Sequence, residues 1–123
     1  MADKRETDIR RAKKEALYFR ELSRLFLQIT LDNPDLNGIH ISAVQLSPDK
    51  SVCNVLFFSE DGFDDFQERL PILILYKPSM RKAIAQSIPS RYTPELVFKY
   101  DKQMEKQRRL EALFDQLKVE GKL

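Results

Sequence analysis

The stretch Gly38–Ser59, GIHISAVQLSPDKSVCNVLFFS, decides the fold because it contains a complete β-hairpin signal. Two runs within it, 38–47 and 51–59, are rich in β-branched and aromatic residues, which favour strands. Between them stands Ser47-Pro48-Asp49-Lys50, where proline presets the φ angle of a turn and aspartate can hydrogen-bond the neighbouring backbone. The stretch therefore predicts two antiparallel strands joined by a tight turn.

The residues before the hairpin predict one long amphipathic helix over 9–31. Apolar residues recur there at spacings of three and four, which is the helical repeat. They are Ile9, Ala12, Ala16, Phe19, Leu22, Phe26 and Ile29. The sequence Asp32-Asn33-Pro34 ends this helix, because the residue before a proline disfavours helical backbone.

The residues after the hairpin predict a second helix that begins near Asp65. Asp64 and Gln67 have the spacing of a capping box, which marks the start of a helix. The middle of the segment is ambiguous, because Pro71 lies inside it and 72–75 could form a strand by itself. A helix and a strand therefore both remain open for the end of this segment.

The sequence Lys77-Pro78-Ser79 predicts a sharp joint to a third helix. Pro78 disfavours helical geometry at Lys77, and Ser79 can cap a helix that ends at Pro89. A last strand is expected over Leu96–Tyr100, with Leu96, Phe98 and Tyr100 on one face and Lys99 on the other.

The tail, 102–123, is charged but carries Leu110, Leu113, Phe114 and Leu117 at helical spacing. We expect a short helix that docks on the domain or frays. The order helix, strand, strand, helix, joint, helix, strand predicts an α+β fold. We expect one domain over 1–101, followed by a partly helical tail over 102–123.

Charge is segregated along the chain, although its formal net value is only +2. Residues 1–31 hold eight Lys or Arg and five Asp or Glu, and residues 66–100 hold six and two. Residues 32–65 hold one lysine and seven acids. If the partner is a polyanion, the two basic segments should face it and the acidic segment should point away.

One face of the first helix is expected to be basic. At about 100° per residue, Arg10, Lys13, Lys14, Arg20 and Arg24 fall within about 120° of one another, nearly opposite the apolar face. An ordinary solvated helix face explains this stripe as well as a binding surface does. The stripe alone therefore does not decide the function.

The residue types of most catalytic and cofactor sites are missing. The chain has one histidine, His40, one cysteine, Cys53, and three glycines, too few for a zinc site or a glycine-rich phosphate loop. The acids Glu60, Asp61, Asp64 and Asp65 lack the ligand spacing of a calcium loop. We therefore expect no enzyme, no cofactor and no metal.

Nothing in the sequence predicts a membrane or a secretory route. The longest apolar run, Leu70–Tyr76, is far shorter than the roughly 20 residues that cross a bilayer. The first residues are charged and contain no signal peptide. A lone cysteine, expected to be buried, suits a reducing cytosol.

Several segments resemble the ribosome-binding factor A family, and the order αββααβ is that of a KH-like RNA-binding domain of the second type. The likeness covers about residues 9–117 through motifs in family order and spacing. They are Glu21–Leu25, Asn33–Leu36, Ile39–Val44, Leu46–Ser51 with Val52–Phe58, Arg91–Phe98 with Asp101, and Arg109–Phe114.

The resemblance implies a cytoplasmic factor that binds the immature 30S subunit near the decoding region and the ends of 16S rRNA. It implies help with late rRNA processing and folding, notably in the cold, with no catalytic residue and no cofactor. The family replaces the GxxG loop of ordinary KH domains by a kinked helix pair with small residues at the joint. Here Tyr76-Lys77-Pro78 stands at that place, which changes how closely an RNA backbone can approach.

We expect the basic residues of the first helix and of the joint to form one RNA-binding face on a monomer. The candidates are Arg10, Arg11, Lys13, Lys14, Arg20, Arg24, Lys77, Arg81, Lys82 and Arg91. Arg91 could instead anchor the last strand, as could Glu95. Two other functions remain open, namely a general KH-like RNA chaperone and a protein–protein adaptor.

Overall fold

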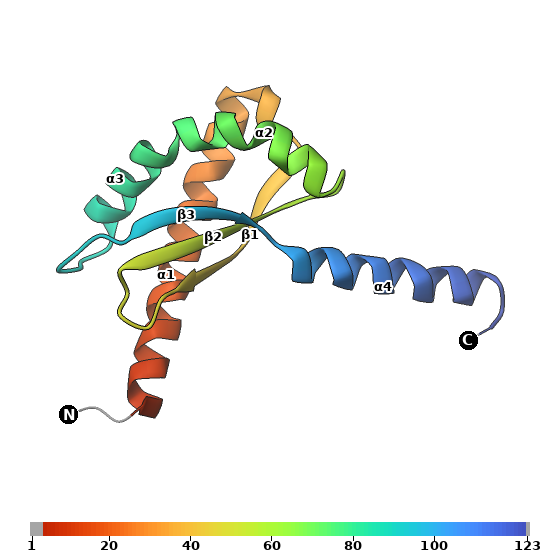
Figure 1. The fold of residues 1–123 in the computed structure, drawn as a ribbon, viewed down its shortest axis with the longest axis horizontal. Coiled ribbons are helices and arrows are strands. Elements are labelled where there is room, and N and C mark those ends of the chain that lie inside the picture. Colours follow the sequence, from red (N-terminus) through yellow and green to blue (C-terminus); the bar gives the residue numbers. More distant parts are fainter. Residues whose placement is uncertain (1–3, 123) are drawn as a thin grey trace.

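The computed structural model describes residues 4–122 and has an αββααβα order in which a three-stranded sheet is covered by helices (Figure 1). The sheet order is β1-β2-β3; β1 and β2 are antiparallel, and β2 and β3 are parallel. The α+β class and the order of the first six main elements confirm the predictions. The elements are α1 (Lys4–Asp32), the 3-10 turn η1 (Pro34–Leu36), β1 (Ile39–Leu46), β2 (Val52–Ser59), α2 (Phe63–Leu75), α3 (Lys77–Ser87), β3 (Glu95–Tyr100) and α4 (Lys102–Val119).

The hairpin forms as its sequence predicts. The Lys50 amide donates to the Ser47 carbonyl at 2.9 Å, and Lys50 has a φ of 62°, which the turn requires. The register shifts between Ile41 and Ala43, so Ser42 is an extra residue on β1. This bulge directs the Ser42 hydroxyl to the Asp101 carboxylate, at 2.6 Å.

Phe57 of β2 is the centre of the core. Its ring is fully buried and lies 5.3 Å from Phe26 of α1, 6.1 Å from Phe66 of α2 and 5.0 Å from Phe98 of β3, measured between ring centroids. Each buried side chain of this size stabilises the fold by about 1.5–3 kcal/mol. The ring thus joins the sheet to two helices.

The apolar face predicted for the first helix is right only in its second half. Leu22, Phe26 and Ile29 are buried, but Ile9 is 47% and Phe19 38% exposed, and Tyr18 is buried instead. The helix begins at Lys4, and its first turns extend past the edge of the sheet (Figure 1). No layer of structure covers those turns within the described residues, so Ile9 stays in solvent; further along the helix, the position of the sheet buries Tyr18 and leaves Phe19 partly exposed.

The joint between the second and third helices differs from the prediction. Neither the Asp64 capping box nor the Ser79 cap forms, because α2 begins after Gly62, whose φ is 97°, and α3 begins directly after Tyr76. Pro78 fits in the first turn of α3, where its missing amide hydrogen has no helical partner to lose. The possible strand over 72–75 is wrong, since those residues belong to α2.

The last helix, α4, contacts the domain only through its first turns, where Met104 packs against the core, so the docking expected for the tail is right for its base alone. Asp101 caps it by accepting a hydrogen bond from the Met104 amide at 2.9 Å. Beyond its first turns it projects away from the domain, and no side chain of its 18 described residues is buried (Figure 1). Leu110, Leu113 and Phe114 are about half exposed. The division of the chain into a domain and a tail stays a prediction.

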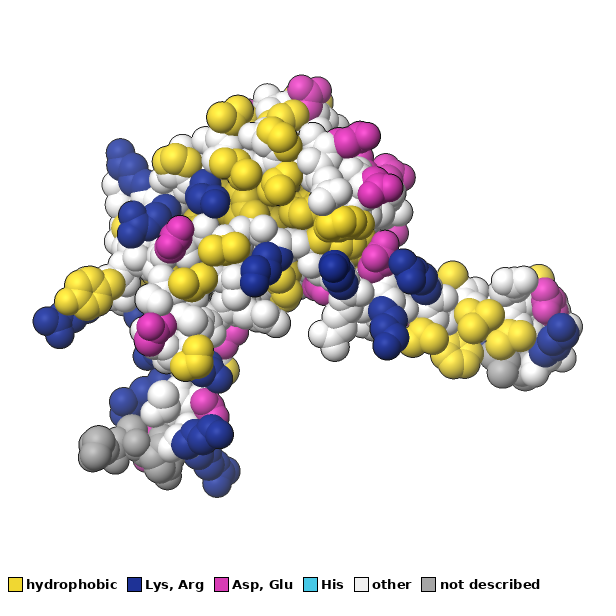
Figure 2. Space-filling view, in the orientation of Figure 1, with side chains coloured by type: hydrophobic (Ala, Val, Ile, Leu, Met, Phe, Trp, Pro, Cys, Tyr) yellow, Lys and Arg dark blue, Asp and Glu magenta, His cyan; other side chains and the backbone are white. Residues whose placement is uncertain are grey.

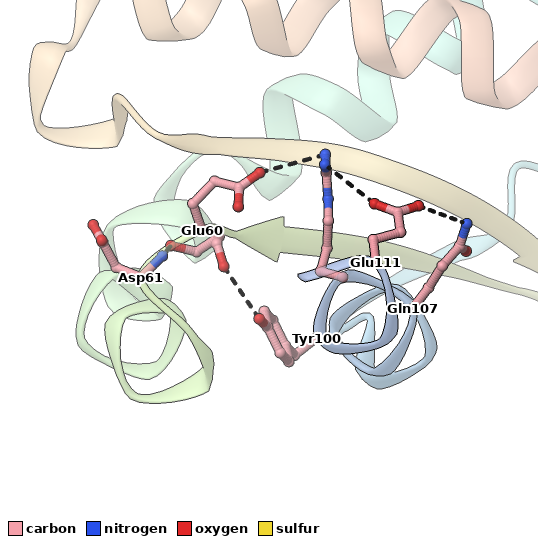
Figure 3. Close-up of polar contacts among 7 residues, drawn as sticks. Glu60, Asp61, Tyr100, Gln107 and Glu111 are labelled. Carbon is pink, nitrogen blue, oxygen red and sulfur yellow. Dashed lines mark hydrogen bonds and ion pairs between the residues drawn. The ribbon is translucent and has the colours of Figure 1, made fainter. Parts of the chain in front are cut away.

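Polar contacts hold the base of α4 against the end of β2 (Figure 3). The Arg108 guanidinium lies 3.4 Å from the Glu60 carboxylate and 3.9 Å from Glu111. The Tyr100 hydroxyl donates to the Ser59 carbonyl at 3.2 Å. The Arg108–Glu60 ion pair links α4 to the end of β2, and the Tyr100 bond links the end of β3 to the same place.

Candidate nucleic-acid interface

The loop that joins α3 to β3, residues 88–94, is held by side chains from two helices. The Arg81 guanidinium of α3 donates to the carbonyls of Thr93 at 3.0 Å and Pro94 at 3.2 Å. Arg81 therefore anchors the approach to the last strand, a role that the sequence also allows for Arg91. The loop backbone is fixed just before β3 begins.

Ser90 joins the same loop to α1. The Lys14 ammonium donates to the Ser90 hydroxyl at 3.0 Å, and that hydroxyl donates to the Tyr92 carbonyl at 2.8 Å. Tyr18, one turn along α1, is buried beside them. Burial raises the pKa of the Tyr18 phenol, and a hydrogen bond with Ser90 opposes that rise. Lys14, one residue of the basic stripe of α1, is thereby placed next to the loop.

Two hollows of about 400 and about 380 Å³ lie beside this loop and share Arg91, Tyr92 and Thr93 in their walls. Arg81 and Lys82 line the first, and Lys14 and Lys50 line the second. We call the cations of both walls the loop basic cluster, which consists of Lys14, Lys50, Arg81, Lys82 and Arg91. Cations that line a concave surface reinforce one another's attraction for an anionic ligand.

The other predicted cations lie on α1 and at the joint, with different surroundings. Arg10, Lys13 and Arg20 are exposed, and within residues 4–122 no ion pair engages them. Arg24 lies 2.9 Å from the Glu21 carboxylate. The Lys77 ammonium stands over the Phe98 ring, 5.1 Å from its centroid.

Arg11 lies apart from the basic stripe of α1. Its guanidinium is 3.3 Å from the Asp8 carboxylate and 3.9 Å from Glu15. Two carboxylates on its own helix therefore offset the charge of Arg11. Among the predicted residues, Lys14, Arg81, Lys82 and Arg91 are brought together, whereas Arg11 is not placed with them.

Figure 2 shows acidic and basic side chains at opposite ends of the domain. Lys and Arg side chains lie over α3 and the loop that follows it, whereas Asp and Glu side chains gather over the N-terminal part of α2. The hairpin turn departs from this separation, because Asp49 lines the second hollow. Its carboxylate accepts hydrogen bonds from the hydroxyls of Ser47 and Ser51, each at 2.7 Å. These bonds lower the pKa of Asp49 to about 2.

Sequence reasoning missed Lys50 and Tyr92. Lys50 belongs to the most acidic segment, and only the folded hairpin carries it to the loop. Tyr92 is 72% exposed, and the Arg91 guanidinium carbon lies 5.4 Å from its ring centroid. The sequence did contain a pattern that could have identified Tyr92 as exposed and available for binding. It is an aromatic residue next to an arginine in a segment with a proline at each end, Pro89-Ser90-Arg91-Tyr92-Thr93-Pro94.

The described part of the chain contains neither clustered metal ligands nor a membrane-spanning helix. Within residues 4–122, no group of three or more His, Cys, Asp or Glu side chains is arranged to hold a metal ion. No helix in the same range is long and apolar enough to cross a membrane. Cys53 is fully buried, as expected, and burial raises its pKa to about 12.

The sequence model of one family, described as Ribosome-binding factor A, matches residues 10–114. This chain belongs to the ribosome-binding factor A family. The resemblance predicted from the motifs is thereby confirmed. Ribosome-binding factor A of Nitrosococcus oceani is 36% identical over 98 residues, covering 78% of this chain and 75% of the relative. That of Alcanivorax borkumensis is 34% identical over 104 residues, covering 84% and 75%.

Solved structures of the ribosome-binding factor A family share the fold. The crystal structure of the Thermus thermophilus protein aligns with a TM-score of 0.61 at 27% identity, over 72% of this chain and 92% of that one. The solution NMR structure of a Thermotoga maritima protein assigned to the same family aligns with a TM-score of 0.67 at 28% identity, over 76% and 88%. These likenesses confirm the KH-like α+β fold.

Proposed function

We propose that this chain binds the immature 30S ribosomal subunit through its 16S rRNA, in the cytoplasm and as a monomer. Binding assists late rRNA processing and folding of the subunit, including growth in the cold. The family membership supports attachment to the ribosome. The proposal includes no catalytic step and no cofactor.

The observation that carries this proposal is the composition of the loop basic cluster. Its five cations come from α1, the hairpin turn, α3 and the loop before β3. Cations brought together from separate parts of a chain repel one another, so an anionic ligand gains by entering between them. RNA phosphates supply such charge, and structured RNA is recognised largely through its backbone and shape.

Sedimentation of a cell lysate, with and without nuclease, tests the proposal. We expect the protein to travel with free small subunits and not with translating ribosomes. The variant Lys82→Glu with Arg91→Glu should leave the subunit fraction, because it reverses two exposed charges of the loop basic cluster. Lys102→Glu with Lys106→Glu, at the base of α4, makes the same change of charge elsewhere and should stay bound.

The two remaining functions give different profiles. A general RNA chaperone would spread over RNA-containing fractions without preference for the small subunit. A protein–protein adaptor would stay in its complex after nuclease treatment. Either profile contradicts the proposed function.

A further inference from the structure

Tyr92 is an aromatic side chain that the fold does not use. Its ring is 72% exposed, whereas Tyr18 and Tyr100 are buried in the core. The Arg91 guanidinium stands over the Tyr92 ring, with 5.4 Å between its central carbon and the ring centroid. A single exposed aromatic side chain is ordinary on a protein surface, so the exposure of Tyr92 gains meaning only from the basic hollows on both sides of it.

The backbone on both sides of Tyr92 is fixed. The Ser90 hydroxyl donates to the Tyr92 carbonyl at 2.8 Å, and Lys14 holds the same hydroxyl from α1. On the other side, Arg81 donates to the Thr93 carbonyl at 3.0 Å. The ring therefore projects from a loop that is already ordered, which reduces the entropy that a ligand has to remove.

Tyr92 also lies where the two basic hollows meet. It lines both of them, with Lys82 in the wall of one and Lys14 and Lys50 in the wall of the other. Figure 2 shows hydrophobic and basic side chains together at the tip of the loop between α3 and β3. An aromatic ring between cations is the arrangement by which proteins hold single-stranded nucleic acid, since bases stack on the ring while cations follow the backbone.

We propose that Tyr92 is a stacking platform for one unpaired nucleobase, and that the phosphates on either side of this base enter the two basic hollows. The inference rests on the proposed function, since it takes RNA as the ligand. It adds a contact that duplex shape cannot supply, because the bases of a helix are already stacked on one another. The site thus favours a single-stranded segment next to a structured region.

The test compares a short single-stranded oligouridine RNA with a blunt RNA duplex, using fluorescence anisotropy. Tyr92→Leu should weaken binding of the single strand by about tenfold and leave duplex binding unchanged. Tyr92→Phe should bind like the wild type, because stacking needs the ring and not the hydroxyl. Phe114→Leu is the matched control, since Phe114 is 54% exposed but lies on α4, away from the loop basic cluster.

The outcomes separate this inference from the proposed function. If the wild type binds both probes and Tyr92→Leu binds the single strand equally well, the stacking site is wrong and the function stands. Equal weakening for both probes also overturns it, since the residue would then act through the shape of the loop. If Tyr92→Leu no longer binds the small subunit but still binds both RNA probes, the ring contacts a protein and the inference fails. A wild type that binds neither probe overturns the stacking site, whereas the proposed function is overturned only if the protein does not travel with free small subunits.

Discussion

Neutralising two residues of the loop basic cluster should make RNA binding less sensitive to salt. The perturbation is Lys82→Gln with Arg91→Gln. Both side chains are exposed, neither forms an ion pair within residues 4–122, and Arg91 contacts the Tyr92 ring. The loss of that contact costs about 0.5–1 kcal/mol at an exposed site, so the variant should fold like the wild type.

The magnitude follows from the number of cations that line the two hollows. If the five cations each neutralise one phosphate, the slope of log affinity against log salt is about −3.5 to −4.5. Removing two of them should make this slope shallower by about 1.4 to 1.8. The affinity should fall most at low salt, where the release of counterions favours binding most strongly.

Anisotropy titrations of a labelled 16S rRNA fragment over a range of potassium chloride concentrations measure the slope. The control is Lys102→Gln with Lys106→Gln, which removes the same charge beside Asp61 and Asp64 at the base of α4. The control should keep the wild-type slope. Equal slopes for the two double variants would refute the reasoning, because net charge and not the loop basic cluster would then govern binding.

Two further predictions concern stability and pH. Asp101→Ala should lower the free energy of unfolding by about 3 kcal/mol in a urea titration, because it removes the α4 cap and a charge-assisted bond from Ser42. A loss below about 1 kcal/mol would contradict this prediction, since the Ser42 bond alone should contribute more. Asp49→Asn should flatten the dependence of stability on pH between about 4 and 2. Folding lowers the pKa of Asp49 from 3.8 to about 2, so the ionised carboxylate stabilises the folded protein above the pKa of the unfolded chain. This stabilisation is lost as the pH falls through the pKa of the folded protein. An unchanged pH profile in thermal melts would contradict this account.

The hairpin and the last strand were predictable because their signals are local. The Ser47–Lys50 turn depends on four adjacent residues, and the alternation of Leu96, Phe98 and Tyr100 needs only a strand with one buried face. The family likeness came from motifs spread over most of the chain and reached the same fold. Local chemistry and family membership therefore agree on the architecture.

The errors arose where neighbouring structure decides the outcome. Phe19 fits a helical repeat as well as Tyr18 does, and only the position of the sheet under α1 decides which of them is buried. Ser79 and Asp64 are good capping residues, but the chain packs with Tyr76 and Gly62 at those boundaries. A spacing of apolar residues also cannot tell whether a partner covers them, as α4 shows.

The candidate interface could be predicted in part. Lys82 and Arg91 lie close together in the sequence, so their proximity followed from the order of the elements. The bond from Lys14 to Ser90 joins residues 76 positions apart, and Lys50 reaches the loop only through the hairpin. Such contacts depend on the packing of α1 against α3 and the sheet, which no local pattern encodes.

The central claim is that the loop basic cluster faces 16S rRNA. Hydroxyl-radical cleavage from an iron chelate, tethered to one introduced cysteine in the full chain on purified immature subunits, tests it most directly. The native Cys53 does not interfere, because it is fully buried and its pKa is raised to about 12. A chelate at Lys82→Cys should cut 16S rRNA at defined positions, whereas one at Asp64→Cys, on the acidic end, should cut weakly or not at all. Strong cleavage from position 64 without cleavage from position 82 would contradict the account.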